Sequence, residues 1–421
     1  MFSLIIKYKS KVKNLGFYFF ASFVPMIISL VMSPLLALFL KPSDYAIVGY
    51  YNSFNTLFLP LILFYLNQYY MREFFYCDEN GKKNLFALIF KTFLWLPFVV
   101  AGIVVGLFGL YMFFFNSSSE IPYLPYAILS FFTIAFSSLF YLEQVLLRNN
   151  RNGKAFFKLC LFNSLAGALA SLVFVIIFDM GAMGRMLGLS IAPISLFSWL
   201  IYKHRDVLNT PYAVSDLKKA IFFCWPLVIA AMLGFFTNGI DRVILEKYVP
   251  MSQLGFYSIG ITIAGYLSVF STAIGNTFSP DVLESLAKKN FRKMLKYVAL
   301  QIGVILFVVV VFVLLAKYLI IIFTANRYLE ATPYARIAAF AAVTTICYST
   351  VSNVIFSYKK TKILLYTKII GSVLCVAMYV FLIKNYSMQG AAIAHSAGNL
   401  VLAVVALLLL LISLYKDKRI K

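Results

Sequence analysis

A small set of charged residues lies inside long apolar stretches, where an ionisable side chain is costly. Asp241 and Arg242 are adjacent in TNGIDRVIL, Glu143 lies near the end of one apolar stretch, and His395 lies within another. A charged side chain at the centre of a membrane helix costs about 2.5–3.5 kcal/mol on insertion scales, so such residues mark ion or substrate pathways. We therefore expect these four residues to act in gating or ion coupling.

Each of these residues also has a structural interpretation. Asp241 and Arg242 would then reach water at the membrane interface, Glu143 would pair with Arg148 or a nearby lysine, and His395 would be a hydrogen-bonded packing residue. Adjacent residues on a helix point about 100° apart, so Asp241 and Arg242 do not form a ready-made ion pair. Both interpretations remain open on the sequence.

A second set of polar residues lies near the ends of the apolar stretches and would suit a phosphorylated substrate. These candidates are Arg72, Lys91, Lys158, Lys368, Asn52 and Asn55. Lysine and arginine capture phosphate or pyrophosphate groups through charge-assisted hydrogen bonds. The alternative is that the cations only set membrane topology and that the asparagines join neighbouring helices.

The composition indicates the elements that must position these residues. Of 421 residues, 62% are hydrophobic and only 12% are charged, whereas soluble chains contain roughly 45–50% and 25%. Two histidines are too few for a metal site, and the five scattered cysteines form no CxxC pair. The sequence also has no GxxxxGK[ST] phosphate loop. We therefore expect an all-α polytopic membrane protein that has no metal site, no cofactor and no catalytic domain, and is not an enzyme.

Twelve stretches are long enough to cross a bilayer as helices, since a crossing needs roughly 20 apolar residues. They lie near 15–39, 44–67, 85–115, 123–147, 159–178, 186–202, 220–243, 254–278, 297–323, 335–357, 363–384 and 389–414. In one of them, the Gly102/Gly106 pair predicts close packing against another helix.

The basic residues predict the orientation of these helices. With the N-terminus in the cytoplasm, inside segments contain 27 Lys and Arg residues and outside segments contain eight. Positive residues concentrate in cytoplasmic loops, so both termini are predicted to be cytoplasmic. The net charge of +22 is thereby explained by topology, and a nucleic acid partner is not expected.

The two halves of the sequence show signs of an internal repeat. MGAMGRMLG (180–188) and QGAAIAHSAG (389–398) align at an offset of 209, and PYA and KKN recur at similar offsets. Six helices per repeat give two lobes of the same orientation, a transporter architecture in which the substrate path lies between the lobes. We predict lobes at residues 1–208 and 209–421.

Because it combines these features, the chain resembles the bacterial polysaccharide flippases (the Wzx type) of the multidrug/oligosaccharidyl-lipid/polysaccharide (MOP) exporter superfamily. The resemblance rests on the twelve spans, the lobe-closing segments GAMGRMLG and QGAAIAHSAG, PSDYAIVGYY after the first span, and TNGIDRVIL followed by QLGFYSIG. It implies a MATE-like fold in the bacterial inner membrane. It also implies that an undecaprenyl-pyrophosphate-linked O-antigen or polysaccharide repeat unit is moved to the outer leaflet by alternating access.

The resemblance further implies H⁺ or Na⁺ as the coupling ion, contact with membrane lipid, and partnership with a polysaccharide polymerase and a chain-length regulator of lipopolysaccharide biosynthesis. Two alternatives remain. A multidrug or small-molecule exporter of the same superfamily would share this architecture. A membrane polysaccharide polymerase is less consistent with the sequence, because no sizeable periplasmic loop is expected.

Overall fold

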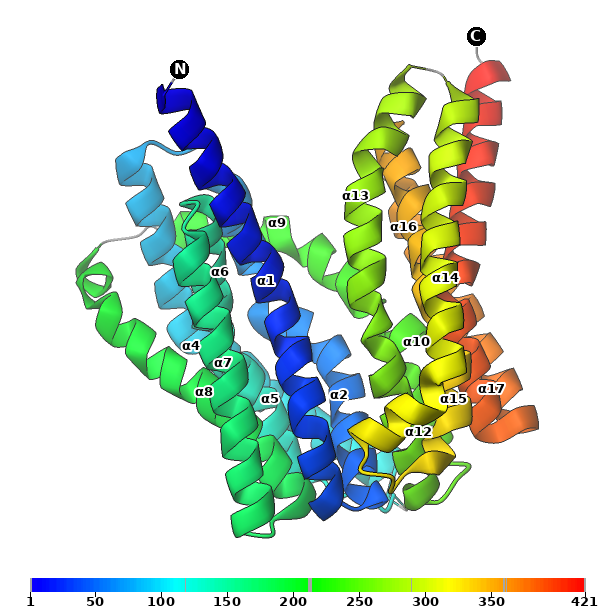
Figure 1. Cartoon of the computed structure of the whole chain (residues 1–421). Coiled ribbons are helices and arrows are strands. Elements are labelled where there is room, and N and C mark those ends of the chain that lie inside the picture. Colours follow the sequence, from blue (N-terminus) through cyan, green and yellow to red (C-terminus); the bar gives the residue numbers. More distant parts are fainter. Residues whose placement is uncertain are drawn as a thin grey trace. The chain divides into compact units, whose positions relative to one another are not determined.

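The computed structural model describes residues 2–117, 119–210, 214–288, 290–358, 360 and 362–419. Every regular element in these ranges is a helix (Figure 1). The chain forms two compact units, which are Met1–Leu40 with Phe54–Met232, and Lys41–Ser53 with Leu233–Lys421.

The first unit contains the helices from α1 to α9, except for the first part of α2. They are α1 (Phe2–Phe39), the second part of α2 (Pro42–Leu63), α3 (Leu66–Glu73), α4 (Glu79–Phe115), α5 (Tyr126–Phe136), α6 (Ser138–Asn149), α7 (Gly153–Leu172), the π-helical turn η1 (Val173–Ile177), α8 (Gly181–Lys203), η2 (Arg205–Asn209) and α9 (Val214–Met232).

The second unit contains the remaining helices and the first part of α2. They are α10 (Phe235–Asn238), α11 (Ile240–Leu245), α12 (Met251–Gly265), α13 (Leu267–Ala287), α14 (Phe291–Phe323), η3 (Leu329–Ala331), α15 (Thr332–Ala338), α16 (Ala341–Ser357) and α17 (Lys362–Arg419).

Helices α2 and α9 show how the compact units relate to the sequence. The first unit includes α9, whose Cys224 is buried in one apolar cluster with Tyr70 and Phe90. Helix α2 is shared, because its residues up to Ser53 belong to the second unit. The lobes at 1–208 and 209–421 stay a prediction about the two halves of the sequence.

Membrane-spanning helices make up most of the fold. Among the described residues, ten helical segments are long and apolar enough to cross a membrane, and Phe23–Phe39 is a shorter apolar helix. The last of the ten, Lys362–Tyr415, contains a reversal that divides it in two. The prediction of an all-α polytopic membrane protein is therefore confirmed, with ten to twelve candidate spans.

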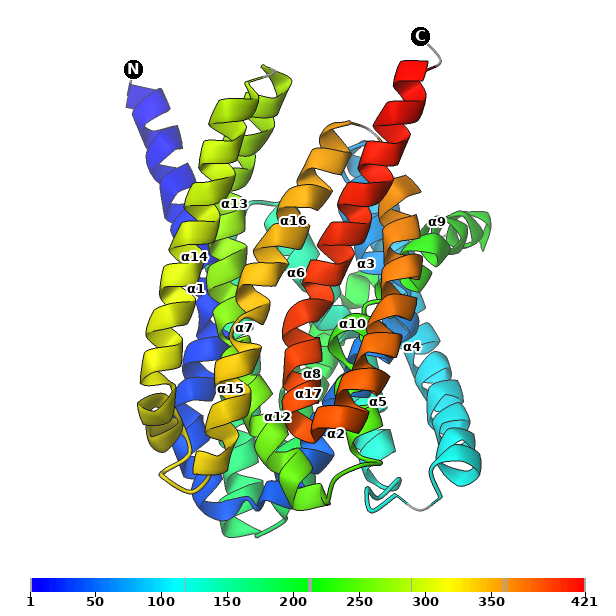
Figure 2. The ribbon, with the colours of Figure 1, turned by 90° about the vertical axis from the view of Figure 1, so that its right-hand side faces the viewer.

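Helix α17 is a hairpin of two helices. The backbone at Ser387 has a φ of 49° and a ψ of −130°, which ends one helix and begins the next (Figure 2). On the two arms, the Cys375 thiol donates to the carbonyl of Gly398 at 3.7 Å. A Cβ placed on Gly390 would lie only 2.0 Å from the Leu382 carbonyl oxygen, so the close return of the chain depends on glycine there.

Side-chain caps explain where several helices begin. Asp78 accepts a hydrogen bond from the Gly81 amide at 2.8 Å, which satisfies a free amide at the start of α4. The helix therefore begins at Glu79, several residues before the predicted apolar stretch 85–115. Asn152 caps α7 in the same way, accepting from the amide three residues later at 3.1 Å.

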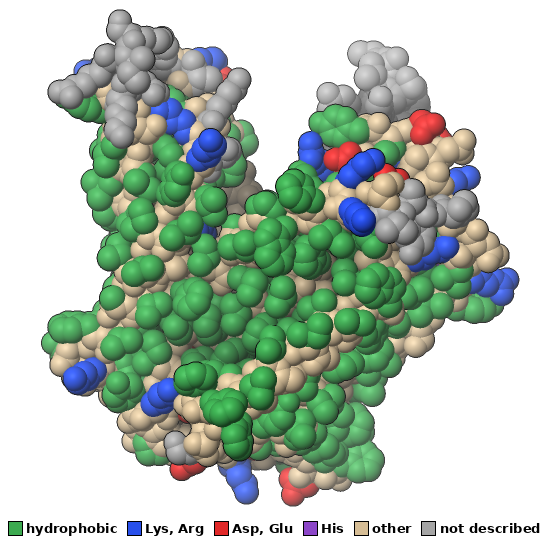
Figure 3. All heavy atoms as spheres, turned by 180° about the vertical axis from the view of Figure 1, so that it is seen from behind, with side chains coloured by type: hydrophobic (Ala, Val, Ile, Leu, Met, Phe, Trp, Pro, Cys, Tyr) green, Lys and Arg blue, Asp and Glu red, His purple; other side chains and the backbone are tan. Residues whose placement is uncertain are grey.

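The outer surface is largely apolar. On the face in Figure 3, hydrophobic side chains cover the middle of the helices, and Lys and Arg gather toward the helix ends. On α14, Phe307 and Leu314 are each 69% exposed, as expected for side chains in contact with lipid. The predicted packing of Gly102 and Gly106 is wrong within this chain, because a Cβ on either would meet no described atom within 4 Å.

Candidate functional site

Asp241 and Arg242 lie on α11, a helix of six residues in the second unit. Gly239 has a φ of −135°, and this non-helical residue separates α11 from α10. Both charged side chains are buried, with exposed fractions of 0% for Asp241 and 8% for Arg242. Buried charges are stable only where hydrogen bonds or opposite charges replace water, so their partners define the site.

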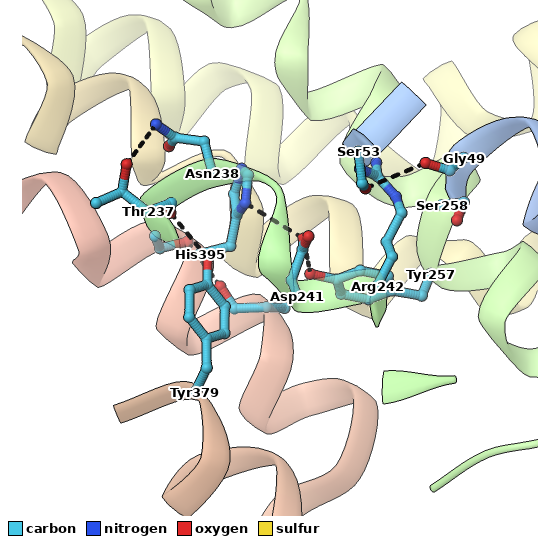
Figure 4. A network of polar contacts seen from close by, with 12 residues as sticks. Gly49, Ser53, Thr237, Asn238, Asp241, Arg242, Tyr257, Ser258, Tyr379 and His395 are labelled. Carbon is cyan, nitrogen blue, oxygen red and sulfur yellow. Dashed lines mark hydrogen bonds and ion pairs between the residues drawn. The ribbon is translucent and has the colours of Figure 1, made fainter. Parts of the chain in front are cut away.

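The Asp241 carboxylate contacts two residues from neighbouring helices (Figure 4). The Tyr257 hydroxyl on α12 donates to Oδ2 at 2.6 Å, and Nδ1 of His395 on α17 lies 3.5 Å from the same oxygen. Oδ1 is buried without a hydrogen-bond partner in the described structure. Tyr379 lies beside this group, and its hydroxyl donates to the Thr237 carbonyl at 3.0 Å.

Arg242 points away from Asp241 toward α2. Its Nη1 donates to the Ser53 hydroxyl at 3.2 Å, and this hydroxyl donates to the Gly49 carbonyl at 3.2 Å. The described residues contain no ion pair between Asp241 and Arg242, in agreement with their adjacent positions on one helix. Arg242 therefore joins α11 to the first part of α2 within the second unit.

The Asp241 group contains residue types that are found in proton relays. A carboxylate can bind a proton, and histidine is the side chain whose ordinary charge change lies nearest to neutral pH. Chains of Asp, Glu and His in membrane segments are typical of proton relays. The structure shows that Asp241 and His395 lie close together, which the sequence does not predict. Their role in gating or ion coupling stays a prediction.

Glu143 belongs to a separate group in the first unit. Its carboxylate accepts from Lys203 Nζ at 2.5 Å and lies 2.9 Å from Nε2 of His204. The side chain is only 2% exposed, and the ring of Phe86 packs against His204 with centroids 5.0 Å apart. The sequence predicts Arg148 or a nearby lysine as the partner of Glu143, and in the structure the partner is Lys203. This pairing supplies a structural role for Glu143.

Arg72 and Lys91 both have contacts within the first unit. The Arg72 guanidinium lies 3.5 Å from Glu73 and stacks over the Phe223 ring at 4.6 Å. Lys91 on α4 donates to the Thr210 carbonyl at 2.7 Å. These contacts give both cations structural roles, and their part in substrate binding stays a prediction.

Lys158 and Lys368 lie in different units. Lys158 is exposed on α7 and lines a cavity between α6, α7 and α8 of the first unit. Lys368 on α17 of the second unit is half-buried, with its ammonium 4.9 Å from the centre of the Tyr348 ring. The structure therefore supplies a different setting for each lysine.

Asn52 and Asn55 lie on α2, on either side of the boundary between the compact units. Asn55 Oδ1 accepts a hydrogen bond from the Ser130 hydroxyl on α5 at 2.8 Å, so it joins two helices of the first unit. Asn52 is exposed. A substrate-binding role for either asparagine stays a prediction.

The sequence did not single out Tyr257, Tyr379, Lys203 or His204. Tyrosine occurs 28 times in the chain, so the two that reach the Asp241 group carry no distinguishing signal. Lys203 and His204 follow an apolar stretch directly, and a basic pair in that place also fits ordinary positive-inside topology. Among the described residues, no group of three or more His, Cys, Asp or Glu could hold a metal ion.

Comparison with known proteins identifies the family. Residues 11–280 match the model of the family described as Polysaccharide biosynthesis protein. The chain belongs to this family. A second family model, MatE, matches residues 226–382.

Solved structures with the same fold cover nearly the whole chain. The lipid II flippase MurJ, in an inward closed conformation, has a TM-score of 0.71 and 16% identity over 94% of this chain and 87% of that chain. An inward-facing multidrug resistance MATE family transporter of the MOP superfamily has a TM-score of 0.71 and 14% identity over 94% and 96%. The fold is therefore MATE/MurJ-like, which confirms the predicted MATE-like fold.

One curated relative is an uncharacterized membrane protein of Haemophilus influenzae, 24% identical over 186 residues, which are 43% of this chain and 46% of the relative. The chain thus spans about half the length of the curated relative it matches. The family match and the shared fold identify a multi-pass membrane protein of the Polysaccharide biosynthesis protein family with a MATE/MurJ-like fold.

Proposed function

We propose that this Polysaccharide biosynthesis protein family member is a flippase for lipid-linked oligosaccharide. Its substrate would be an undecaprenyl-pyrophosphate-linked O-antigen or polysaccharide repeat unit, moved from the inner to the outer leaflet of the bacterial inner membrane by alternating access. The observation that carries this proposal is the family match over residues 11–280. The fold shared with a protein named as a lipid II flippase supports a lipid-linked cargo.

We also propose that the Asp241 group couples this movement to a proton gradient. The carboxylate is buried, and Tyr257 and His395 both approach its Oδ2. Hard cations bind best where several oxygen ligands surround them, whereas a carboxylate beside an imidazole suits proton exchange. These features favour H⁺ over Na⁺ as the coupling ion.

Deletion of the gene tests the substrate. Lipid-linked repeat units are expected to accumulate in the inner leaflet, and surface glycan should disappear until the gene is restored. Reporters of leaflet position and of surface glycan measure the two effects. Intact surface glycan in a strain with no redundant flippase would contradict the proposal. Loss of glycan without accumulation of inner-leaflet intermediates would instead favour a role as the polymerase. We propose that a separate polymerase and a chain-length regulator act in the same assembly pathway.

Variants of Asp241 test the coupling. In reconstituted vesicles with an imposed pH gradient, Asp241→Asn should reduce movement of the lipid-linked substrate to the level of protein-free vesicles. Asp216→Asn is the matched control, because Asp216 is a half-exposed carboxylate paired with Lys219 on the outside of α9. Equal activity of the two variants, or transport driven by a sodium gradient at equal pH, would contradict proton coupling at this site.

A multidrug exporter is the second candidate, because the MatE model matches residues 226–382 and the fold is shared with a multidrug resistance transporter. Efflux of hydrophobic cations from the same vesicles, without movement of lipid-linked sugar, would favour that function.

A further inference from the structure

A cavity of about 480 Å³ lies between α6, α7 and α8 of the first unit. It is lined by Glu143, Leu147, Ala155, Lys158, Leu159, Phe162, Ser195, Leu196, Trp199 and Lys203. Its volume is within the range of about 300–1,000 Å³ that ligand pockets occupy. All ten residues belong to one compact unit, so the cavity is complete within it.

Most of the lining is apolar, and it continues onto the outer surface of the helices. Phe162 is 48% exposed and Trp199 is 49% exposed, although both are large apolar side chains. On helices long and apolar enough to cross a membrane, exposed faces of this kind contact lipid. Tryptophan concentrates at the membrane interface, where it contacts both chains and headgroups. The cavity is therefore accessible to membrane lipid.

The polar residues of the cavity leave a positive charge without a partner. Glu143 is satisfied by Lys203 and His204, which approach its two oxygens at 2.5 Å and 2.9 Å. Lys158 has no ionic or hydrogen-bonding partner among the described residues. The Lys203 ammonium lies 5.1 Å from the Trp199 ring and carries three N–H donors, of which Glu143 takes one. Donors of two lysines thus remain for an anion.

We propose that this cavity binds an anionic phospholipid of the surrounding membrane. The phosphate would contact Lys158 and Lys203, and an acyl chain would lie along Leu159, Leu196 and Phe162. The charge of the cavity and its opening to lipid favour this occupant over a zwitterionic lipid. Basic pockets between membrane helices on the cytoplasmic side bind anionic headgroups, and 148–158 and 203–219 are predicted to lie on that side. This site is separate from the Asp241 group and does not depend on the proposed function.

Lipid retention measured by native mass spectrometry tests the proposal. Protein would be delipidated, incubated with phosphatidylglycerol or phosphatidylcholine, and scored for bound lipid. Wild-type protein should retain phosphatidylglycerol in preference to phosphatidylcholine. Lys158→Gln should lower phosphatidylglycerol retention severalfold, and Ala155→Phe should lower it by filling the cavity.

Lys218→Gln provides the matched control, because Lys218 is an exposed lysine of the same unit that does not line the cavity. It should retain phosphatidylglycerol as wild-type protein does. Equal losses of phosphatidylglycerol retention in Lys158→Gln and Lys218→Gln would overturn the proposal. Unchanged retention in an Ala155→Phe protein that thermal unfolding shows to be folded would also overturn it. Preference for undecaprenyl phosphate over phosphatidylglycerol would also overturn it, because the cavity would then belong to the cargo.

Discussion

Gly49 lies where Ser258 and Arg242 leave no room for a side chain. A Cβ at this position would be 2.5 Å from the Ser258 hydroxyl oxygen and 3.3 Å from Arg242 Nε. Because overpacking forces neighbouring groups to move, Gly49→Ala should lower the free energy of unfolding by about 1–3 kcal/mol. Thermal unfolding of the purified protein in detergent measures this change.

Gly102→Ala is the control for this prediction, since a Cβ there would meet no described atom within 4 Å. Alanine is favoured over glycine within a helix by about 1 kcal/mol, so this variant should be as stable as wild type or more stable. Adding Ser258→Gly to Gly49→Ala should restore part of the lost stability. Similar melting temperatures for the two glycine variants would contradict the packing described around Arg242.

The ion pair of Lys203 with Glu143 should contribute more stability than a pair at the surface. Lys203→Met leaves the Glu143 carboxylate, which is only 2% exposed, with His204 as its remaining close partner. Removing one partner of a buried acceptor lowers the free energy of unfolding by about 1–3 kcal/mol. Lys219→Met removes a pair whose partners are both more than half exposed, and such pairs contribute about 0–1 kcal/mol.

Chemical unfolding of the two lysine variants provides the comparison. A smaller loss in Lys203→Met than in Lys219→Met would show that water or another cation replaces the missing ammonium. The same substitution at both positions keeps the change in charge and in side-chain chemistry equal.

The site residues differ in how far the sequence predicts them. Asp241 and His395 were identified because charge in an apolar stretch is rare, a property that can be read at a single position. Their approach to one oxygen, shared with Tyr257, depends on how α11, α12 and α17 pack, and no local pattern specifies that packing. The charge of Lys158 predicts a phosphate ligand at that position, whereas the cavity beside it is formed by three packed helices.

At the scale of elements, the hairpin in α17 depends on two residues with different constraints. Ser387 adopts a φ of 49°, a conformation that glycine reaches without strain, so Ser387→Gly should raise the melting temperature slightly. Gly390→Ala should lower it strongly, because the new Cβ would lie 2.0 Å from the Leu382 carbonyl oxygen. Melting curves of both purified variants test the pair.

Gly265→Ala serves as the control for the hairpin, since a Cβ there would meet no described atom within 4 Å. Its melting temperature should stay close to that of the wild type. A Gly390→Ala protein as stable as Gly265→Ala would mean that the chain does not return as closely as described.

The apolar stretches predicted the spanning helices well, because a length of about 20 apolar residues is a strong local signal. The breaks between short helices were harder to predict. Phe64 and Tyr65 both have positive φ values, near 50°, between α2 and α3, and neither residue type favours that conformation. Such backbone conformations are imposed by packing, so the sequence around them reads as one continuous helix.

At the scale of the whole molecule, the proposed function requires that the chain cross the membrane with a defined sidedness. The count of 27 inside against eight outside cations predicts this sidedness, since lysine and arginine are retained in the cytoplasm during insertion. The family and the fold are consistent with many crossings but do not place any particular loop. The orientation therefore has to be measured at individual positions.

Four single-cysteine variants, made in a protein without its five native cysteines, measure the orientation. Glu120→Cys and Glu330→Cys lie in segments predicted to be outside, and Lys83→Cys and Lys288→Cys lie in segments predicted to be cytoplasmic. In intact spheroplasts, a membrane-impermeant maleimide should label the first pair only, and permeabilisation should expose the second pair. Each pair contains one position from each half of the chain, so the halves are tested independently. If one half followed this pattern and the other reversed it, an odd number of crossings would separate them, and the prediction of two lobes with the same orientation would be wrong.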